Sequence, residues 1–245
     1  MKKSYKAILF DLDGTLVPMN TDEFTVGYFQ DLGKKVDCFG YSMEDFQKII
    51  WSGVKAMVLN DGSRQNRDAF WAKFSELTGI TDEAKLREMD AMCLDFYGNE
   101  FKMAKRFVGD NPLAKEAVSL ARTKAATVVL ASNPLFPMVG HGTRLGYVGL
   151  SLDDFDMATS YETDTFCKPN PQYFTALCDR IGVAPSECLM IGNDEMEDGY
   201  AASKAGLDVY ICTDSIIPSK EKPWQGEKGT FADMLKMLEG LLPTA

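Results

Sequence analysis

The sequence predicts an α/β fold, in which a doubly wound, mostly parallel sheet forms a core that carries an inserted four-helix cap. Short apolar runs alternate with helical segments through most of the 245 residues, and this alternation is typical of strand–helix–strand units. Polar residues follow several of these runs directly, at the strand ends where such sheets bind their ligands. One long stretch near the N-terminus shows helical periodicity without a strand, which indicates the insertion.

Five short segments, most of them apolar runs, are expected to form the strands of the sheet. Each is short enough for a buried strand and ends at a turn or a polar residue. The segments cover residues 5–10, 127–131, 156–160, 188–192 and 207–212. Helices are expected at residues 112–124, 134–145, 171–181, 197–205 and 231–242. The stretch 213–229 contains several Pro and Gly residues and is expected to be an exposed loop.

The helical insertion is expected at residues 18–107, between the core segments 1–17 and 108–245. Its apolar residues recur at three- and four-residue spacing, and four helices are expected to begin near Thr21, Ser42, Arg64 and Thr81. About 115 residues separate Leu16 from Ser132, whereas a strand–helix–strand unit needs only roughly 30 residues. The surplus fits a compact helical module.

Charge and hydropathy restrict the partners of the chain. The net charge of -10 argues against binding to nucleic acid or to an anionic membrane. No stretch approaches the ~18 apolar residues of a membrane helix, and the N-terminal apolar run is too short for a signal peptide. A cytoplasmic protein that acts on a small molecule is therefore expected. The only histidine, His141, is interpreted as structural.

Four polar clusters follow one another along the chain, and together they predict a single site. They are Asp11-Leu12-Asp13-Gly14-Thr15, Ser132-Asn133, Lys168-Pro169, and Gly192-Asn193-Asp194 with Asp198. Because the carboxyl ends of parallel strands lie at one edge of a sheet, these clusters are expected to meet there. Each cluster alone has an ordinary explanation, such as a turn for Asp-Gly-Thr. The prediction depends on their joint occurrence.

These motifs resemble those of the haloacid dehalogenase superfamily. DLDGTL after an apolar run looks like the first motif of that family, LASN like the second, KPNP like the third and IGNDEMED like the fourth. The resemblance covers the chain outside the helical insertion and implies a Rossmann-like core. The insertion resembles the helical cap of the first cap class. The resemblance implies a phosphatase that uses Mg²⁺ and acts on a small phosphorylated substrate.

The chemistry of the first two aspartates also follows from general principles. A carboxylate nucleophile splits a slow phosphoryl transfer into two easier displacements, and Asp11 at a strand end is placed for this role. Asp13 is interpreted as the general acid and base. Lys168 is expected to neutralise the transferring group, and Ser132 to bind its oxygens. The predicted catalytic residues are Asp11, Asp13, Ser132 and Lys168, and the predicted substrate-binding residues are Thr15, Ser132, Asn133 and Lys168.

The resemblance also implies a magnesium site. Its protein ligands would be the carboxylates of Asp11 and Asp194 and the main-chain carbonyl of Asp13, with Asn193 and Asp198 beside them. Asn193 stands between Gly192 and Asp194, which departs from the commoner Gly-Asp form and leaves open which of the two aligns with the ligand. A carboxylate binds Mg²⁺ better than an amide does, which favours Asp194.

Two other functions stay open at this point. A sugar-phosphate mutase shares all four motifs, and a non-catalytic relative would keep only the binding of a ligand. Asp13 argues against a dehalogenase, because that branch of the family has no acid there. Substrate choice is expected to come from the inserted helices, where the polar cluster of residues 64–67 (Arg-Gln-Asn-Arg) is a hypothetical contact for the leaving group. The sequence does not predict the oligomeric state.

Overall fold

The computed structural model describes residues 3–244, except for the side chain of Cys38. Within residues 3–244, six strands form one sheet in the order β3-β2-β1-β4-β5-β6, and each neighbouring pair is parallel. The strands are β1 (Ala7–Phe10), β2 (Thr127–Leu130), β3 (Met157–Ala158), β4 (Cys188–Gly192), β5 (Asp208–Cys212) and β6 (Glu227–Gly229). The predicted α/β class and parallel sheet are confirmed.

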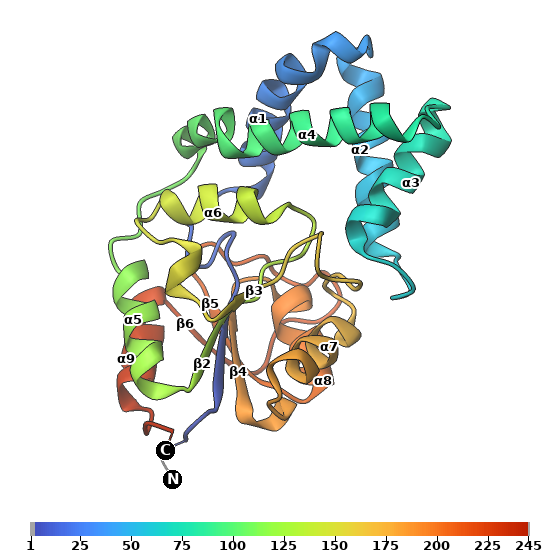
Figure 1. Cartoon of the computed structure of the whole chain (residues 1–245). Coiled ribbons are helices and arrows are strands. Elements are labelled where there is room, and N and C mark those ends of the chain that lie inside the picture. Colours follow the sequence, from blue (N-terminus) through green and yellow to red (C-terminus); the bar gives the residue numbers. More distant parts are fainter. Residues whose placement is uncertain (1–2, 245) are drawn as a thin grey trace.

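Helices cover both faces of the sheet (Figure 1). Ile8 and Phe10 of β1 share a hydrophobic cluster with α5 (Ala114–Lys124) and α9 (Phe231–Gly240). Because side chains alternate along a strand, Ala7 and Leu9 point to the other face. There they pack in a second cluster, to which α7 (Pro171–Ile181) and α8 (Ala201–Ala205) contribute. Burial on both faces explains why the central strands β1 and β4 are continuous apolar runs.

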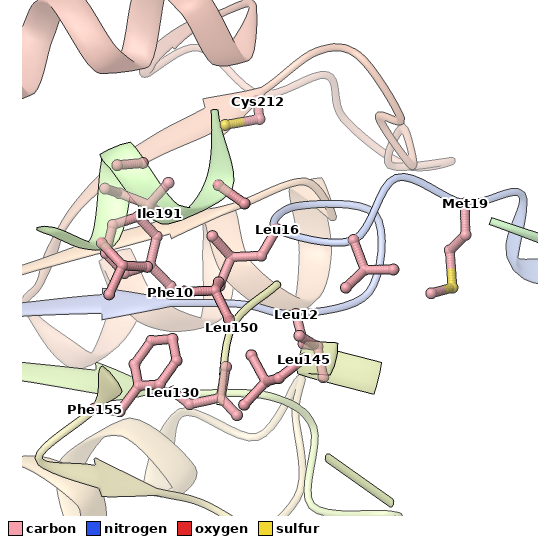
Figure 2. Packing of buried hydrophobic residues seen from close by; sticks show 14 of the residues in the cluster. Phe10, Leu12, Leu16, Met19, Leu130, Leu145, Leu150, Phe155, Ile191 and Cys212 are labelled. Carbon is pink, nitrogen blue, oxygen red and sulfur yellow. The ribbon is translucent and has the colours of Figure 1, made fainter. Parts of the chain in front are cut away.

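The turn after β1 is anchored on this core (Figure 2). Phe10, Leu130 and Ile191 come from three neighbouring strands, and Leu12 and Leu16 of the turn pack into the same cluster. The backbone N–H of residue 11 donates to the Ile191 carbonyl at 2.9 Å. Asp11 and Asp13 therefore each stand next to buried apolar residues in the sequence, and the packing of these neighbours fixes the backbone of the turn.

The helical insertion consists mainly of α1 (Thr21–Val36), α2 (Met43–Val58), α3 (Asn66–Thr78) and α4 (Glu83–Gly98), followed by a 3₁₀ helix (Glu100–Phe107). Ser42 caps α2 as predicted, because its hydroxyl accepts a hydrogen bond from the Asp45 N–H at 3.1 Å. The caps of α1 and α4 are Asn20 and Asp82, so these helices begin within two residues of the predicted starts.

The chain leaves and re-enters the core at one place. Met19 forms an antiparallel bridge with Val108, and the Gly109 N–H donates to the Pro18 carbonyl at 2.8 Å. This crossing coincides with the boundaries of the predicted insertion, 18–107. The division into two domains stays a prediction that this pairing supports.

Three local details differ from the sequence predictions. Strand β6 lies inside the stretch 213–229 that we predicted as a loop. Helix α6 (Met138–Gly146) begins after Pro137 rather than at residue 134, because Pro lacks an N–H and disfavours helix at the preceding residue. The helix expected at 197–205 begins earlier, with a π-helical segment (Glu195–Tyr200). Within the described part of the chain, no helix has the length and apolar character that would be needed to cross a membrane.

Phe10→Ala tests the role of the cluster under the site. Phe10 is fully buried, and removing a buried aromatic ring from a packed core costs about 3–5 kcal/mol. We expect the free energy of unfolding, measured with denaturant, to fall by that amount. Val26→Ala on α1 is the control, because Val26 is 60% exposed and surface changes stay within about 0.5 kcal/mol. Equal losses for both variants would contradict the assignment.

Candidate active site

The turn at residues 11–15 joins the first motif to the fourth. Thr15 Oγ1 lies 3.1 Å from Asn193 Oδ1 and 3.3 Å from Asp11 Oδ2, close enough to donate to either. Gly14 has a φ of +88°, and a Cβ at this position would lie 2.2 Å from Asn193 Nδ2. Only glycine allows both the left-handed backbone and this close approach. The first turn therefore requires the glycine that the motif contains.

Lys168 lies between two carboxylates. Its Nζ atom donates to Asp11 Oδ1 at 2.9 Å and to Asp198 Oδ1 at 2.6 Å, and the lysine side chain is fully buried. Burial alone would lower the pKa of Lys168, but the charges of Asp11 and Asp198 outweigh it and raise the pKa well above its ordinary value. Lys168 is therefore a permanent cation next to the predicted nucleophile.

Asp198 connects this lysine to the loop of the fourth motif. Its second oxygen, Oδ2, accepts hydrogen bonds from the backbone N–H groups of Asn193 at 3.0 Å and of Asp194 at 3.1 Å. A Cβ at Gly192 would lie 2.2 Å from the same oxygen. Asp198 thus fixes both the lysine and the backbone of the loop.

The second motif positions the loop that carries Lys168. Asn133 Oδ1 accepts from the Lys168 N–H at 3.2 Å, and Asn133 Nδ2 lies 2.9 Å from Glu197 Oε2. The Ser132 carbonyl accepts hydrogen bonds from Thr159 Oγ1 at 2.7 Å and from the Tyr173 hydroxyl at 3.0 Å. These bonds fix the backbone at the end of β2, and Ser132 and Asn133 both line the cavity that contains Asp11.

Asn193 and Asp194 have different environments. The Asn193 side chain bonds to Thr15 Oγ1 and donates to the Ser215 carbonyl at 2.7 Å. Asp194 Oδ1 accepts from the N–H groups of residues 196 and 197 at 2.7 and 2.8 Å, and no hydrogen bond within residues 3–244 uses its Oδ2. The amide of Asn193 is therefore occupied by structural bonds, whereas Asp194 keeps an oxygen for a ligand.

Arg144 is a site residue that the sequence analysis missed. It lies on α6, is fully buried, and pairs through Nη1 with Asp13 Oδ2. Its guanidinium stacks on Phe136 at 4.1 Å from the ring centroid, and its Nη2 lies 2.8 Å from His141 Nδ1. The single histidine therefore supports this arginine, in keeping with a structural role. An arginine whose acidic partner lies 131 residues away gives no local sequence signal.

Only one carboxylate oxygen of Asp13, Oδ2, has a partner among the described residues, and that partner is Arg144. The Oδ1 atom of Asp13 is buried and has no hydrogen-bond partner within the described residues. Burial raises the pKa of Asp13, although the charge of Arg144 opposes this shift. A carboxyl group with a raised pKa and one uncommitted oxygen is suited to carry a proton.

The carboxylates at this cavity fit a divalent cation. Asp11, Asp13 and Asp194 all line it, and oxygen atoms are the ligands that Mg²⁺ takes in proteins. No three acidic, His or Cys side chains within residues 3–244 are grouped as a complete metal site. The implied set contains only two carboxylates and one main-chain carbonyl, because Mg²⁺ commonly takes its remaining oxygens from substrate and water.

The polar cluster at the start of α3 does not face this cavity. None of residues 64–67 is among the described residues that line it. Asn66 is fully buried and donates to Cys167 Sγ at 3.2 Å, and Arg67 forms an ion pair with Asp90. The structure thus gives Asn66 a packing role and Arg67 a pairing role, and the hypothesis that one of the four residues contacts the leaving group finds no support.

The family assignment follows from a match over most of the chain. Residues 5–206 match the family model described as haloacid dehalogenase-like hydrolase. The chain belongs to this family. It is therefore an enzyme of the hydrolase class, as predicted.

Individual relatives of the chain carry phosphatase names. The chain is 28% identical over 221 residues to "Putative phosphatase YhcW" of Bacillus subtilis, covering 86% of this chain and 84% of the relative. It is 24% identical over 207 residues to a "Phosphoglycolate phosphatase" of Nitrosospira multiformis, covering 84% and 82%. Against the longer "Protein SUPPRESSOR OF QUENCHING 1, chloroplastic" of Arabidopsis thaliana, 28% identical, the match covers 82% of this chain but 17% of that protein.

Solved structures share the fold. A 2-haloacid dehalogenase from Pseudomonas syringae superposes with a TM-score of 0.62 at 18% identity, covering 96% of this chain and 98% of that one. A family enzyme from Bacteroides thetaiotaomicron, solved with magnesium and inorganic phosphate, gives a TM-score of 0.50 at 20% identity over 91% and 98%. At these identities the likeness shows the fold alone.

Lys168→Met tests the buried ion pairs. Removing the cation leaves two buried carboxylates without their partner, which costs about 3–5 kcal/mol of unfolding free energy. The double variant Lys168→Met/Asp198→Asn should lose less than the sum of its two single variants, because one unpaired charge is gone. Lys6→Met is the matched control, since Lys6 and Glu187 form an exposed pair at 2.8 Å worth at most about 1 kcal/mol. Strict additivity in the double variant would argue against the coupling.

Proposed function

We propose that this hydrolase is a magnesium-dependent phosphatase that cleaves small phosphomonoesters through an aspartyl-phosphate intermediate on Asp11. The observation that carries the proposal is the placement of Asp11 at the carboxyl end of β1, 2.9 Å from the buried cation of Lys168 and on the same cavity as Asp13. The phosphatase names of the relatives support it. Asp13 separates the site from that of a dehalogenase, which needs no proton donor for a halide leaving group.

In the first step, an Asp11 carboxylate oxygen attacks the phosphorus atom, and the bond from phosphorus to the ester oxygen breaks. Asp13 gives its proton to that oxygen, so that the alcohol leaves neutral. In the second step, the Asp13 carboxylate takes a proton from water. The resulting hydroxide attacks phosphorus, the bond between phosphorus and Asp11 breaks, and inorganic phosphate is released. Asp11 is then a carboxylate again and Asp13 is protonated.

The remaining predicted residues act on the phosphoryl group. Lys168 places its positive charge at Asp11, so it offsets the negative charge that collects there as the phosphoryl group approaches. Ser132 and Asn133 line the same cavity and are proposed to bind phosphoryl oxygens. Thr15 Oγ1 lies within hydrogen-bonding distance of Asp11 Oδ2, and this contact is proposed to orient the carboxylate.

The metal would be held by the carboxylates of Asp11 and Asp194 and by the carbonyl of Asp13. When bound, Mg²⁺ supplies positive charge that stabilises the phosphoryl oxygens during transfer. The choice of Asp194 over Asn193 is supported by the structural bonds that already occupy the Asn193 amide.

Asp11→Asn should abolish turnover. An amide is a poor nucleophile, so we expect the release of inorganic phosphate from a generic phosphomonoester to fall at least about 10³-fold, with an unchanged circular dichroism spectrum. Asp208→Asn is the control, because Asp208 begins β5 at the opposite end of the sheet and is partly exposed; it should keep its rate within about threefold. Full activity of the Asp11 variant would refute the nucleophile. Isomerisation of a sugar phosphate without net phosphate release would instead indicate a mutase.

Removing the metal should abolish activity reversibly. Treatment with a chelator is expected to stop phosphate release, and excess Mg²⁺ should restore it, because the proposed Mg²⁺ supplies positive charge that stabilises the phosphoryl oxygens during transfer. The Asp194→Asn variant should require a higher Mg²⁺ concentration for half-maximal rate, whereas Asp208→Asn should require the same concentration as the unmodified chain. Activity that persists after exhaustive chelation would exclude the proposed cofactor.

A further inference from the structure

The cavity that begins at Asp11 continues toward the inserted helices, and its far end is mostly apolar. It has a volume of about 280 Å³. Helices α1, α2, α3 and α4 all contribute to its walls. The side chains at this end include the aromatic rings of Tyr28, Trp51, Phe70, Trp71 and Tyr97, together with the aliphatic groups of Leu32, Ile50, Val54 and Met57.

Positive charge is missing from this end of the cavity. None of the described residues that line it is Lys, Arg or His. The cations nearby are committed elsewhere: Lys168 bonds to Asp11 and Asp198, and Arg144 pairs with Asp13. A negatively charged leaving group would therefore meet no partner here, and burying an unpaired carboxylate is strongly unfavourable.

Asp90 lines the cavity, and its carboxylate already has hydrogen-bond and ion-pair partners. Among the described lining residues of α1 to α4, only Asp90 is charged. Its Oδ1 accepts from Trp71 Nε1 at 2.9 Å and from the Tyr161 hydroxyl at 3.0 Å, and its Oδ2 pairs with Arg67. Asp90 is thus a buried structural anchor that offers little to a ligand and repels anions.

From this lining we infer that the natural substrate is a phosphomonoester of an uncharged, largely apolar alcohol with an aromatic ring or a group of similar size. The inference rests on the proposed phosphatase function and adds the chemistry of the leaving group. Aromatic walls stabilise a buried ring by apolar burial and by stacking. Glycolate carries a carboxylate, so 2-phosphoglycolate does not fit this cavity, although relatives bear its name.

The volume agrees with a leaving group of this size. A cavity of about 150 Å³ takes up benzene, so the present cavity can hold a phosphoryl group at Asp11 together with one ring. Trp51 lies at the cavity and is 52% exposed, which places an aromatic surface where a ligand would pass from solvent into the site.

The inference is tested with three alkyl phosphates whose leaving groups differ in polarity. They are 2-phenylethyl phosphate, glycerol 1-phosphate and 2-phosphoglycolate, each assayed with Mg²⁺ by release of inorganic phosphate. We expect kcat/KM for 2-phenylethyl phosphate to exceed that for both others by about 10- to 100-fold, which is the effect of burying one ring. The same order is expected for binding to the Asp11→Asn variant, measured by calorimetry without turnover.

Val54→Lys provides a matched change in the cavity. Val54 lines it from α2, and a lysine there would supply the missing cation. The preference for 2-phenylethyl phosphate over 2-phosphoglycolate should fall at least about tenfold, because a carboxylate would gain a charged partner. Val26→Lys makes the same chemical change on the exposed side of α1 and should leave the preference unchanged. A thermal melt checks that each variant is folded.

The possible outcomes separate this inference from the function on which it rests. If 2-phosphoglycolate is hydrolysed and bound at least as well as 2-phenylethyl phosphate, while Asp11→Asn stays inactive, the phosphatase function stands and the apolar leaving group is refuted. If none of the three esters is hydrolysed in the presence of Mg²⁺, both proposals fall. If Val54→Lys does not fold, the calorimetric order with Asp11→Asn decides the matter alone.

Discussion

The ion pairs of Lys168 with Asp11 and Asp198 are the interaction on which the rest of the site depends. They join residues that are 157 and 30 positions apart in the sequence. A buried lysine is stable only where carboxylates face it, and each of these carboxylates needs the lysine in return. Asp198 passes this constraint to the fourth motif through its two backbone hydrogen bonds. The nucleophile, the cation and the proposed metal loop are therefore fixed as one unit.

The sequence predicts this unit well because the arrangement follows from sheet topology. Asp11 comes directly after β1, Ser132 follows β2, and Asp194 follows β4. In a parallel sheet all these ends lie at one edge, and the β2-β1-β4 order makes the strands neighbours. A buried strand is recognisable from a few apolar residues, so the positions of the polar residues after it are predictable as well.

The parts that were missed have no comparable local pattern. Strand β6 is three residues long and its first two residues are exposed, so it lacks the apolar run that marks the others. Arg144 lies in a segment whose sequence predicts a helix but no site residue. Its role depends on the ion pair with Asp13, which lies far away in the sequence. The chemistry of the cavity depends on which faces of the inserted helices meet, and that is set by tertiary packing rather than by the motifs.

Aromatic contacts join the inserted helices to the segment that carries Phe136, next to α6. Tyr28 of α1 packs at 5.8 Å between ring centroids against Phe136, and Phe136 lies 6.2 Å from Phe101 of the 3₁₀ helix. The guanidinium of Arg144 also stacks on Phe136, and the same guanidinium pairs with Asp13. The residues that hold the acid and the residues that line the apolar end of the cavity therefore share one aromatic ring.

The fourth motif continues directly into a π-helical segment at Glu195–Tyr200. Here the N–H of Gly199 reaches the Asp194 carbonyl at 3.0 Å, five residues back, while the Asp198 N–H bonds to the same carbonyl at 2.9 Å. A π turn accommodates one residue more than an α turn does, and such turns often occur at functional sites. Asp198 lies within this wider turn, and its Oδ1 accepts a hydrogen bond from Lys168 Nζ at 2.6 Å. Asn193, which precedes the segment, bonds to Thr15 and Ser215, and Asp194, which caps the segment, lines the cavity.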